Sequence, residues 1–96
     1  MKILVTGGAG FLGSHVADAL SEQGHQVTIL DIRKSPYVRH DQIMIVGDIL
    51  DQKTVDTVVQ ENDVVYHFSG ISDIDECADR PVETVKYNVL GTVQLL

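Results

Sequence analysis

Four glycines stand within seven residues near the start of the chain, at Gly7, Gly8, Gly10 and Gly13. They follow a short apolar run at residues 2–6 and precede an amphipathic stretch at residues 11–23. Glycine loses more conformational entropy on folding than any other residue, so a cluster this dense indicates a backbone that must turn tightly or approach a ligand closely. We interpret the segment as a loop that joins a buried strand to a helix and binds a phosphate-bearing ligand.

The glycine positions suit a diphosphate. The first glycine allows a tight turn with positive φ, Gly10 leaves room for a pyrophosphate, and Gly13 lets the helix pack closely on the strand. The start of the helix adds free N–H groups and roughly half a positive charge. The residues expected at the diphosphate are Gly7, Gly10, Phe11, Leu12 and Gly13. No lysine follows the last glycine, which excludes a Walker-type triphosphate loop, and the remaining alternative is a glycine-rich turn without a ligand.

Apolar periodicity predicts strands that alternate with helices. We expect strands at residues 2–6, 26–31, 42–46 and 63–68, and helices at residues 11–23, 51–61 and 81–96. In the first helix Leu12, Val16 and Leu20 recur every four residues, with Ala17 and Ala19 alongside, which is the spacing of an apolar face. Gly24 suits the end of this helix, and Asp51 suits the cap of the next. The alternation predicts an α/β fold with a parallel sheet and right-handed crossovers.

An acidic residue ends the second predicted strand. Asp31 lies eighteen residues after Gly13, near the spacing of about 20 at which a carboxylate accepts hydrogen bonds from the adenosine ribose. It would repel a 2′-phosphate, which favours NAD over NADP. Ile32 and Arg33 follow directly and belong to the same predicted site. Arg33 and Lys34 could instead face a 2′-phosphate, and the alternative for both is a solvated loop.

Two further sites follow the third and fourth strands, where open α/β sheets bind ligands. Asp48 could accept from the adenine amino group while Ile49 packs on the ring, and the alternative for Asp48 is an Asx-turn or a helix cap. Phe68, Ser69 and Gly70 would let a dinucleotide pass close to the backbone, and the alternative is a plain turn after the strand.

Composition excludes several classes of protein. The chain has 96 residues, which fits one domain, and at 44% hydrophobic residues it can build a core. The net charge of −7 argues against nucleic-acid and anionic-membrane partners. The single cysteine excludes an internal disulfide and a cysteine-rich zinc site, and the histidines show no metal-ligand spacing. No apolar run is long enough for a membrane span, so we expect a soluble cytoplasmic protein without a metal.

The fourth strand and the last helix raise the question of completeness. The fourth strand is fully apolar, yet in a sheet ordered 3-2-1-4 it would be an edge, and an exposed apolar edge invites pairing with another chain. The last predicted helix stops at Leu96 without a glycine or a capping residue. We therefore expect either that more protein follows, or that the chain associates through this edge. The alternative is that the last helix covers the edge.

Five motifs in order along the chain resemble one family. They are the loop at residues 6–13 (TGGAGFLG), Asp31, residues 47–49 (GDI), residues 67–70 (HFSG) and residues 88–92 (NVLGT). Together they resemble the NAD-dependent epimerase/dehydratase branch of the extended short-chain dehydrogenase/reductases, over the whole chain. The resemblance implies a Rossmann-type doubly wound parallel sheet, about four strands in the order 3-2-1-4, forming an incomplete domain. It also implies a retained NAD and reactions on nucleotide sugars, such as C4 epimerisation or 4,6-dehydration.

The chain departs from that family at its catalytic pair. The family uses Tyr-x-x-x-Lys, but Tyr37, Tyr66 and Tyr87 are followed four residues later by Asp41, Gly70 and Gly91. We therefore expect no catalytic residue in this chain and no turnover by it alone. Residues 1–96 would be the NAD-binding amino-terminal part of a nucleotide-sugar epimerase or dehydratase, without its catalytic and substrate regions. The alternatives are a non-catalytic dinucleotide-binding module and an NADPH-dependent reductase of the same superfamily.

Overall fold

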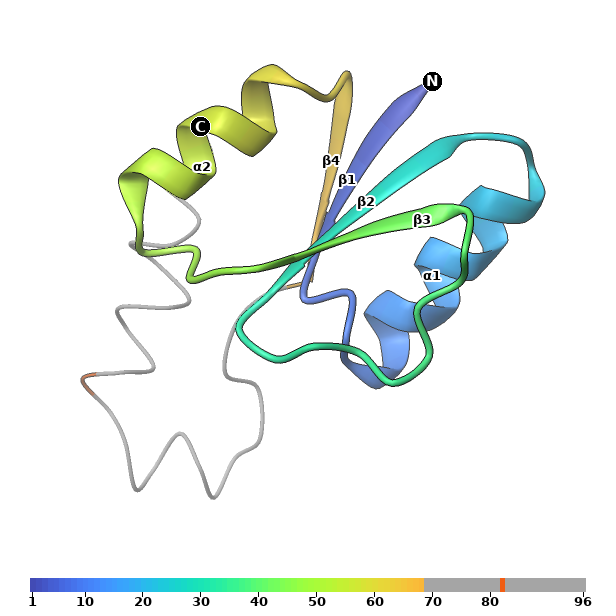
Figure 1. Ribbon diagram of the computed structural model, residues 1–96, viewed down its shortest axis with the longest axis horizontal. Helices are drawn as coiled ribbons and strands as arrows, with labels where there is room; N and C mark the ends of the chain where they lie inside the picture. Colours follow the sequence, from blue (N-terminus) through green and yellow to red (C-terminus); the bar gives the residue numbers. More distant parts are fainter. Residues whose placement is uncertain (69–81, 83–96) are drawn as a thin grey trace.

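A four-stranded parallel sheet lies between two helices in the computed structural model, which describes residues 1–68 and 82 (Figure 1). The elements are β1 (Lys2–Thr6), α1 (Phe11–Glu22), β2 (Gln26–Asp31), β3 (Gln42–Val46), α2 (Gln52–Gln60) and β4 (Val64–His67). These bounds agree with the sequence prediction to within two residues. The predicted third helix at residues 81–96 lies outside the described residues.

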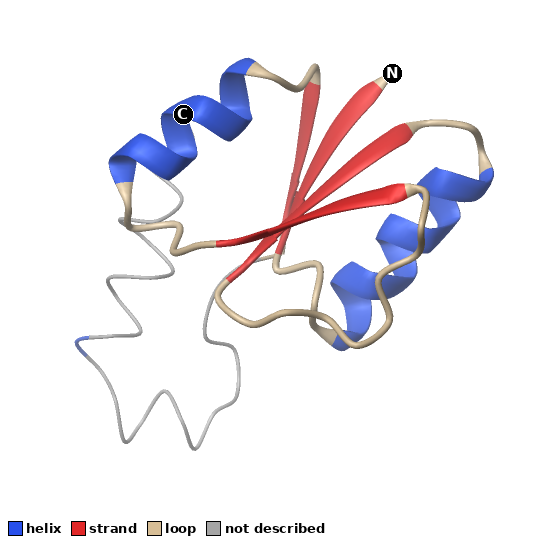
Figure 2. Ribbon diagram, in the orientation of Figure 1, coloured by secondary structure: helices blue, strands red, loops and turns tan. Residues whose placement is uncertain are grey.

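The strand order is β3-β2-β1-β4, with every pair parallel, as predicted. Val5 of β1 stands opposite Ile29 on one side and Tyr66 on the other. β1 is therefore a central strand, and the chain reverses its direction of travel across the sheet between β3 and β4. The parallel pairing places the carboxyl ends of all four strands at one end of the sheet, where β1, β2 and β3 lead into the loops drawn in tan in Figure 2.

The two faces of the sheet each carry a separate apolar cluster. On one face Ile3, Val5, Val27 and Ile29 pack with Ala17 of α1. On the other face Leu4 and Leu30 pack with Val58 of α2. Successive side chains of a strand point to opposite faces, so burial on both sides explains the apolar run of β1 and the buried residues 27–30 of β2, where Thr28 is the one polar member. One helix on each face makes the sheet doubly wound.

α1 meets the sheet mainly through small residues, and this corrects part of the predicted apolar face. The buried residues of α1 are Gly13, Ala17 and Ser21, whereas Leu12 is 59% exposed. Small side chains at intervals of four residues let the helix backbone lie close to β1 and β2, and Leu20 is partly buried and packs against the same apolar cluster. The Ser21 hydroxyl donates to the Ala17 carbonyl at 2.9 Å, so its burial leaves no polar group unpaired.

Both predicted helix boundaries are confirmed. Gly24, directly after α1, has a φ of +89°, a conformation that glycine adopts without strain. Asp51 caps α2, because its Oδ1 accepts from Lys53 N at 3.2 Å and its Oδ2 accepts from the Thr54 hydroxyl at 2.9 Å.

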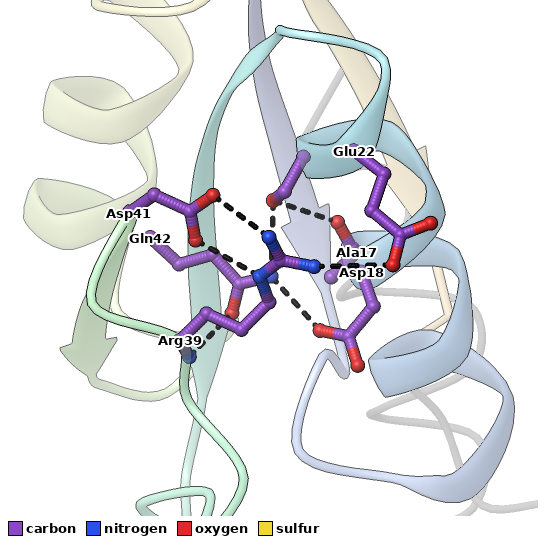
Figure 3. Close-up of polar contacts among 7 residues, drawn as sticks. Ala17, Asp18, Glu22, Arg39, Asp41 and Gln42 are labelled. Carbon is purple, nitrogen blue, oxygen red and sulfur yellow. Dashed lines mark hydrogen bonds and ion pairs between the residues drawn. The ribbon is translucent and has the colours of Figure 1, made fainter.

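A polar cluster fastens α1 to the start of β3 (Figure 3). The buried Gln42 amide donates to Asp18 Oδ1 and to Ser21 Oγ, both at 3.0 Å, and its Oε1 accepts from Arg39 N at 3.1 Å. The Arg39 side chain pairs with Asp41 at 3.0 Å and reaches Glu22 at 3.4 Å. The hydrogen bonds that the Arg39 guanidinium donates to Asp41 raise the pKa of Arg39. The cluster fixes the far end of the loop that leaves β2.

Candidate dinucleotide-binding site

The loop after β1 turns sharply through its first glycine. Gly7 has a φ of +72° and donates its N–H to Leu30 O at 2.9 Å, which continues the pairing of β1 with β2. The Gly7 carbonyl then accepts from Gly10 N at 3.1 Å and closes the turn. A residue with a side chain would be strained at this positive φ, so the first glycine is required by the backbone, as the sequence predicted.

Gly10 and Gly13, two of the other three glycines of the loop, differ in what surrounds them. A Cβ on Gly13 would collide with the carbonyl group of Gly7, so this glycine is needed for α1 to begin against the turn. A Cβ on Gly10 would meet only Gly7 O, at 3.4 Å, which is an ordinary contact. The fold therefore requires glycine at position 13. At position 10 the fold has room for a side chain, so a glycine there suits a ligand that lies close to the backbone.

The first turn of α1 offers unpaired N–H groups. Gly10 is the N-cap residue and provides no side-chain cap, and the first helical bond runs from Ser14 N to Gly10 O at 2.9 Å. Within residues 1–68 and 82, the N–H groups of Phe11, Leu12 and Gly13 have no acceptor. No acidic residue lies in this turn. Together with the helix dipole, these donors form a site for a phosphate group.

Asp31 lies beside this loop, at the end of β2. Its Oδ2 accepts from the N–H of Ala9, inside the loop, at 3.0 Å, and its Oδ1 accepts from Arg33 N at 3.1 Å. Each carboxylate oxygen has two acceptor positions, so both can still accept a ribose hydroxyl. Ile32 and Arg33 are exposed next to it, with Ile32 at 55%.

After β3, Asp48 forms the Asx-turn that the sequence analysis named as the alternative to an adenine contact. Asp48 Oδ1 accepts from Leu50 N at 2.9 Å, which is an Asx-turn. The Gly47 N–H donates to Asp31 O at 2.9 Å, so this turn lies next to the end of β2. Ile49 is only 3% exposed and contributes to the core. An adenine contact for Asp48 and Ile49 stays a prediction.

The end of β4 is joined to β1 through Thr6. Phe68 N donates to the Thr6 carbonyl at 2.9 Å and reaches the Thr6 hydroxyl at 3.1 Å. The same hydroxyl lies 2.6 Å from His67 Nδ1, and burial lowers the pKa of His67. Thr6 is fully buried, and sequence reasoning missed its role. A polar residue that ends an apolar strand just before the glycines was the available signal. Ser69 and Gly70 lie outside the described residues.

The glycine loop, Asp31, the turn at residues 47–49 and the Thr6 contact all lie where the parallel strands end. With the strand order β3-β2-β1-β4 and the uncapped start of α1, they define a Rossmann-type dinucleotide-binding fold. The chain belongs to the NAD dependent epimerase/dehydratase family, whose sequence model matches residues 3–96.

Curated relatives carry names of enzymes that act on UDP-sugars. A UDP-glucose 4-epimerase of Halalkalibacterium halodurans is 41% identical, over 100% of this chain and 30% of that protein. A UDP-N-acetyl-alpha-D-glucosaminuronate decarboxylase of Bacillus cytotoxicus is 35% identical, over 99% of this chain and 32% of that protein. The chain therefore spans about a third of the length of these relatives.

Solved structures of epimerases share the fold closely. The UDP-glucose 4-epimerase of Thermotoga maritima with UDP-glucose superposes with a TM-score of 0.91 at 30% identity, over 99% of this chain and 32% of that one. The UDP-glucose 4-epimerase of Thermus thermophilus in complex with NAD gives a TM-score of 0.90 at 31% identity, over 99% of this chain and 32% of that one.

Two features are absent from residues 1–68 and 82. No helix in this part of the chain is long and apolar enough to cross a membrane. No group of three or more histidine, cysteine or acidic side chains in the same residues is arranged to hold a metal ion.

Proposed function

We propose that this chain binds NAD across the carboxyl ends of its strands. The pyrophosphate would lie over the first turn of α1, and the adenosine ribose would donate to Asp31. The observation that carries the proposal is the set of N–H groups at Phe11, Leu12 and Gly13, which have no acceptor within residues 1–68 and 82, beside an accepting carboxylate. Donors for a diphosphate at the start of α1 and an acceptor for a diol at the end of β2 fit the adenosine diphosphate half of NAD.

The rest of the predicted site follows from the same pose. Ile32 and Arg33 would flank the ribose, and Asp48 and Ile49 would lie toward the adenine. Phe68, Ser69 and Gly70 would line the path toward the nicotinamide. Phe68 is 36% exposed.

We further propose that residues 1–96 form the NAD-binding part of a nucleotide-sugar epimerase or dehydratase. NAD, when bound, supplies the acceptor and donor of a hydride for oxidation and reduction at a sugar carbon. This chain would bind and orient it, while the acid and base would come from elsewhere, because no Tyr-x-x-x-Lys pair is present. The UDP-sugar relatives support a nucleotide-sugar substrate. Isomerase and oxidoreductase chemistry, a cytoplasmic location and the lack of nucleic-acid and membrane partners are parts of the same proposal.

Association through β4 is a further part of the proposal. Within the described residues β4 is the last strand of the sheet, and Val64 and Val65 are half-buried while Tyr66 is exposed. Such an edge suits pairing with another strand. An analytical ultracentrifugation series over protein concentration tests it, and a monomer at every concentration would contradict association between copies.

A non-catalytic dinucleotide-binding module is the second candidate. Its support is that Tyr37, Tyr66 and Tyr87 lack a lysine four positions later. An NADPH-dependent reductase rests only on Arg33 and Lys34, and Asp31 opposes it because a carboxylate repels a 2′-phosphate.

Calorimetric titration of the chain with NAD and with NADP tests the proposal. We expect NAD to bind more tightly, by at least tenfold, because Asp31 would accept from the ribose hydroxyls of NAD and would repel the 2′-phosphate of NADP. Equal affinity or tighter NADP binding would overturn the role of Asp31, and no binding of either would overturn the proposed function. The module and the enzyme are separated by assaying a longer protein that contains this sequence for hydride transfer with UDP-glucose.

A further inference from the structure

The Asp31 carboxylate contacts the glycine-rich loop at residues 7–13, which is the proposed phosphate-binding loop and is called the phosphate loop below. Its Oδ2 accepts the N–H of Ala9 at 3.0 Å, although the two residues are 22 positions apart in the sequence. Ala9 lies between Gly8 and Gly10, in the most glycine-rich part of the loop. The ribose-binding acid and the diphosphate-binding backbone are therefore joined by a direct hydrogen bond.

This bond differs from the other hydrogen bonds of the loop. Gly7 N donates to Leu30 O and Gly10 N donates to Gly7 O, so both pair with main-chain carbonyls. Ala9 N pairs with a side chain. In the described part of the chain, the N–H groups of Gly7, Ala9 and Gly10 each have an acceptor. Only the acceptor of Ala9 is a side chain, so a substitution at another position can remove this hydrogen bond and leave the other two intact.

We propose that Asp31 is a positioning residue of the phosphate loop, and that it strengthens diphosphate binding even for a ligand without ribose hydroxyls. The inference rests on the proposed function, since it concerns the same site. Glycine-rich backbone has many accessible conformations, and an unanchored loop must lose that freedom when it binds. The Ala9 bond removes part of that cost before the ligand arrives.

The direction in which diphosphate affinity changes when Asp31 is removed distinguishes a positioning role from charge repulsion. Asp31 carries a negative charge close to the place where a diphosphate would bind. By charge alone, its removal would strengthen the binding of an anion. If Asp31 acts only on ribose hydroxyls, a ligand without them should bind an Asp31 variant equally well or better. If Asp31 positions the loop, that ligand should bind the variant more weakly.

The experiment compares ADP with 2′,3′-dideoxy-ADP by calorimetry on the 96-residue chain, at one fixed salt concentration. Asp31→Ala removes both acceptor oxygens. We expect it to weaken ADP at least tenfold and dideoxy-ADP at least threefold. Asp51→Ala is the matched control, because it also removes one carboxylate that accepts a backbone N–H, but at the start of α2. We expect this control to change dideoxy-ADP binding by less than twofold.

A second variant and a second measurement complete the test. Asp31→Asn keeps the side-chain size but has one acceptor oxygen for the N–H groups of Ala9 and Arg33. If Asp31→Ala does not fold, the expected threefold loss of dideoxy-ADP affinity is measured on Asp31→Asn instead. Hydrogen exchange at the Ala9 amide, measured without ligand, should accelerate at least tenfold in the variant.

The outcomes separate the inference from the function on which it rests. A dideoxy-ADP affinity that weakens less than threefold, or an unchanged Ala9 exchange rate, overturns the inference while ADP binding by the wild type stands. Failure of the wild type to bind ADP at all overturns the proposed function instead.

Discussion

The hydroxyl oxygen of Thr6 lies 2.6 Å from Nδ1 of His67, and the contact joins β1 to β4 at the edge where the phosphate loop begins. Thr6 is fully buried and His67 is half-buried, so the pair has limited access to water. A charged imidazolium is disfavoured in such a place. The stability of the contact between β1 and β4 therefore depends on pH.

We predict that His67 makes the chain less stable below neutral pH. Burial lowers its pKa in the folded state from the ordinary value of 6.5, so the unfolded chain takes up the proton first as the pH falls. This contribution to stability is fully present above 6.5 and is lost as the pH falls toward the lower folded pKa. Urea unfolding at pH 7.5 and about pH 5.5 measures the loss. His67→Gln should lose less stability over this interval, whereas the exposed His40→Gln should behave as the wild type. Equal losses in all three would contradict the linkage.

We predict opposite behaviour for two loop glycines. Gly10→Val should fold normally, because Gly10 has a φ of −78° and a ψ of 174° and a Cβ there meets only one atom, at 3.4 Å. It should weaken NAD binding at least tenfold, about 1.4 kcal/mol, by filling the space of the pyrophosphate. Calorimetry gives the affinity and thermal unfolding gives the stability.

Gly13→Ala is the contrasting substitution, which we expect to lower stability. Its Cβ would collide with the Gly7 carbonyl, so we expect a loss of about 1–3 kcal/mol in the free energy of unfolding. Undiminished NAD binding by Gly10→Val would show that the loop does not hold the diphosphate.

We predict that Asp31→Ala weakens NAD by about 1.5–3 kcal/mol, because a charged acceptor of ribose hydroxyls is lost. It should weaken NADP far less, because the repulsion of the 2′-phosphate disappears at the same time. The ratio of the two dissociation constants, measured by calorimetry at one salt concentration, is the readout. A ratio that equals that of the wild type would remove Asp31 from the choice of cofactor.

We predict that the buried amide of Gln42 matters more for stability than the ion pairs of Arg39. Gln42→Ala leaves Asp18 Oδ1 and the Arg39 N–H without their partner and should cost about 1–3 kcal/mol in the free energy of unfolding. Arg39→Ala removes only solvent-screened pairs with Asp41 and Glu22, so its effect should be much smaller. Urea unfolding of the two variants side by side tests the order, and a larger loss for Arg39→Ala would reverse it.

Local patterns were sufficient to predict the individual strands and helices of the described residues. The apolar run of β1 indicated a strand buried on both faces, and Gly24 and Asp51 marked helix boundaries through backbone preferences that are independent of the rest of the fold. The order β3-β2-β1-β4 followed from the alternation of strands and helices together with the family resemblance.

Contacts between distant residues were not predictable in the same way. Of the predicted apolar face of α1, Ala17 is buried and Leu20 packs against the core, but Leu12 is exposed, and close packing buries Gly13 and Ser21, which the periodicity did not include. Periodicity counts apolar residues and does not measure how closely two backbones approach. The bond from Ala9 to Asp31 depends on the turn at Gly7, which brings the loop back over β2.

The connection from β2 to β3 is held at both of its ends. Asp31 binds the N–H of Arg33 at one end, and Gln42 binds that of Arg39 at the other. Between them Lys34, Pro36 and Tyr37 are exposed, so their charge and size can be redesigned while the flanking strands stay in register. Altered nucleotide preference could then be engineered in this short stretch, leaving the sheet and the phosphate loop unchanged.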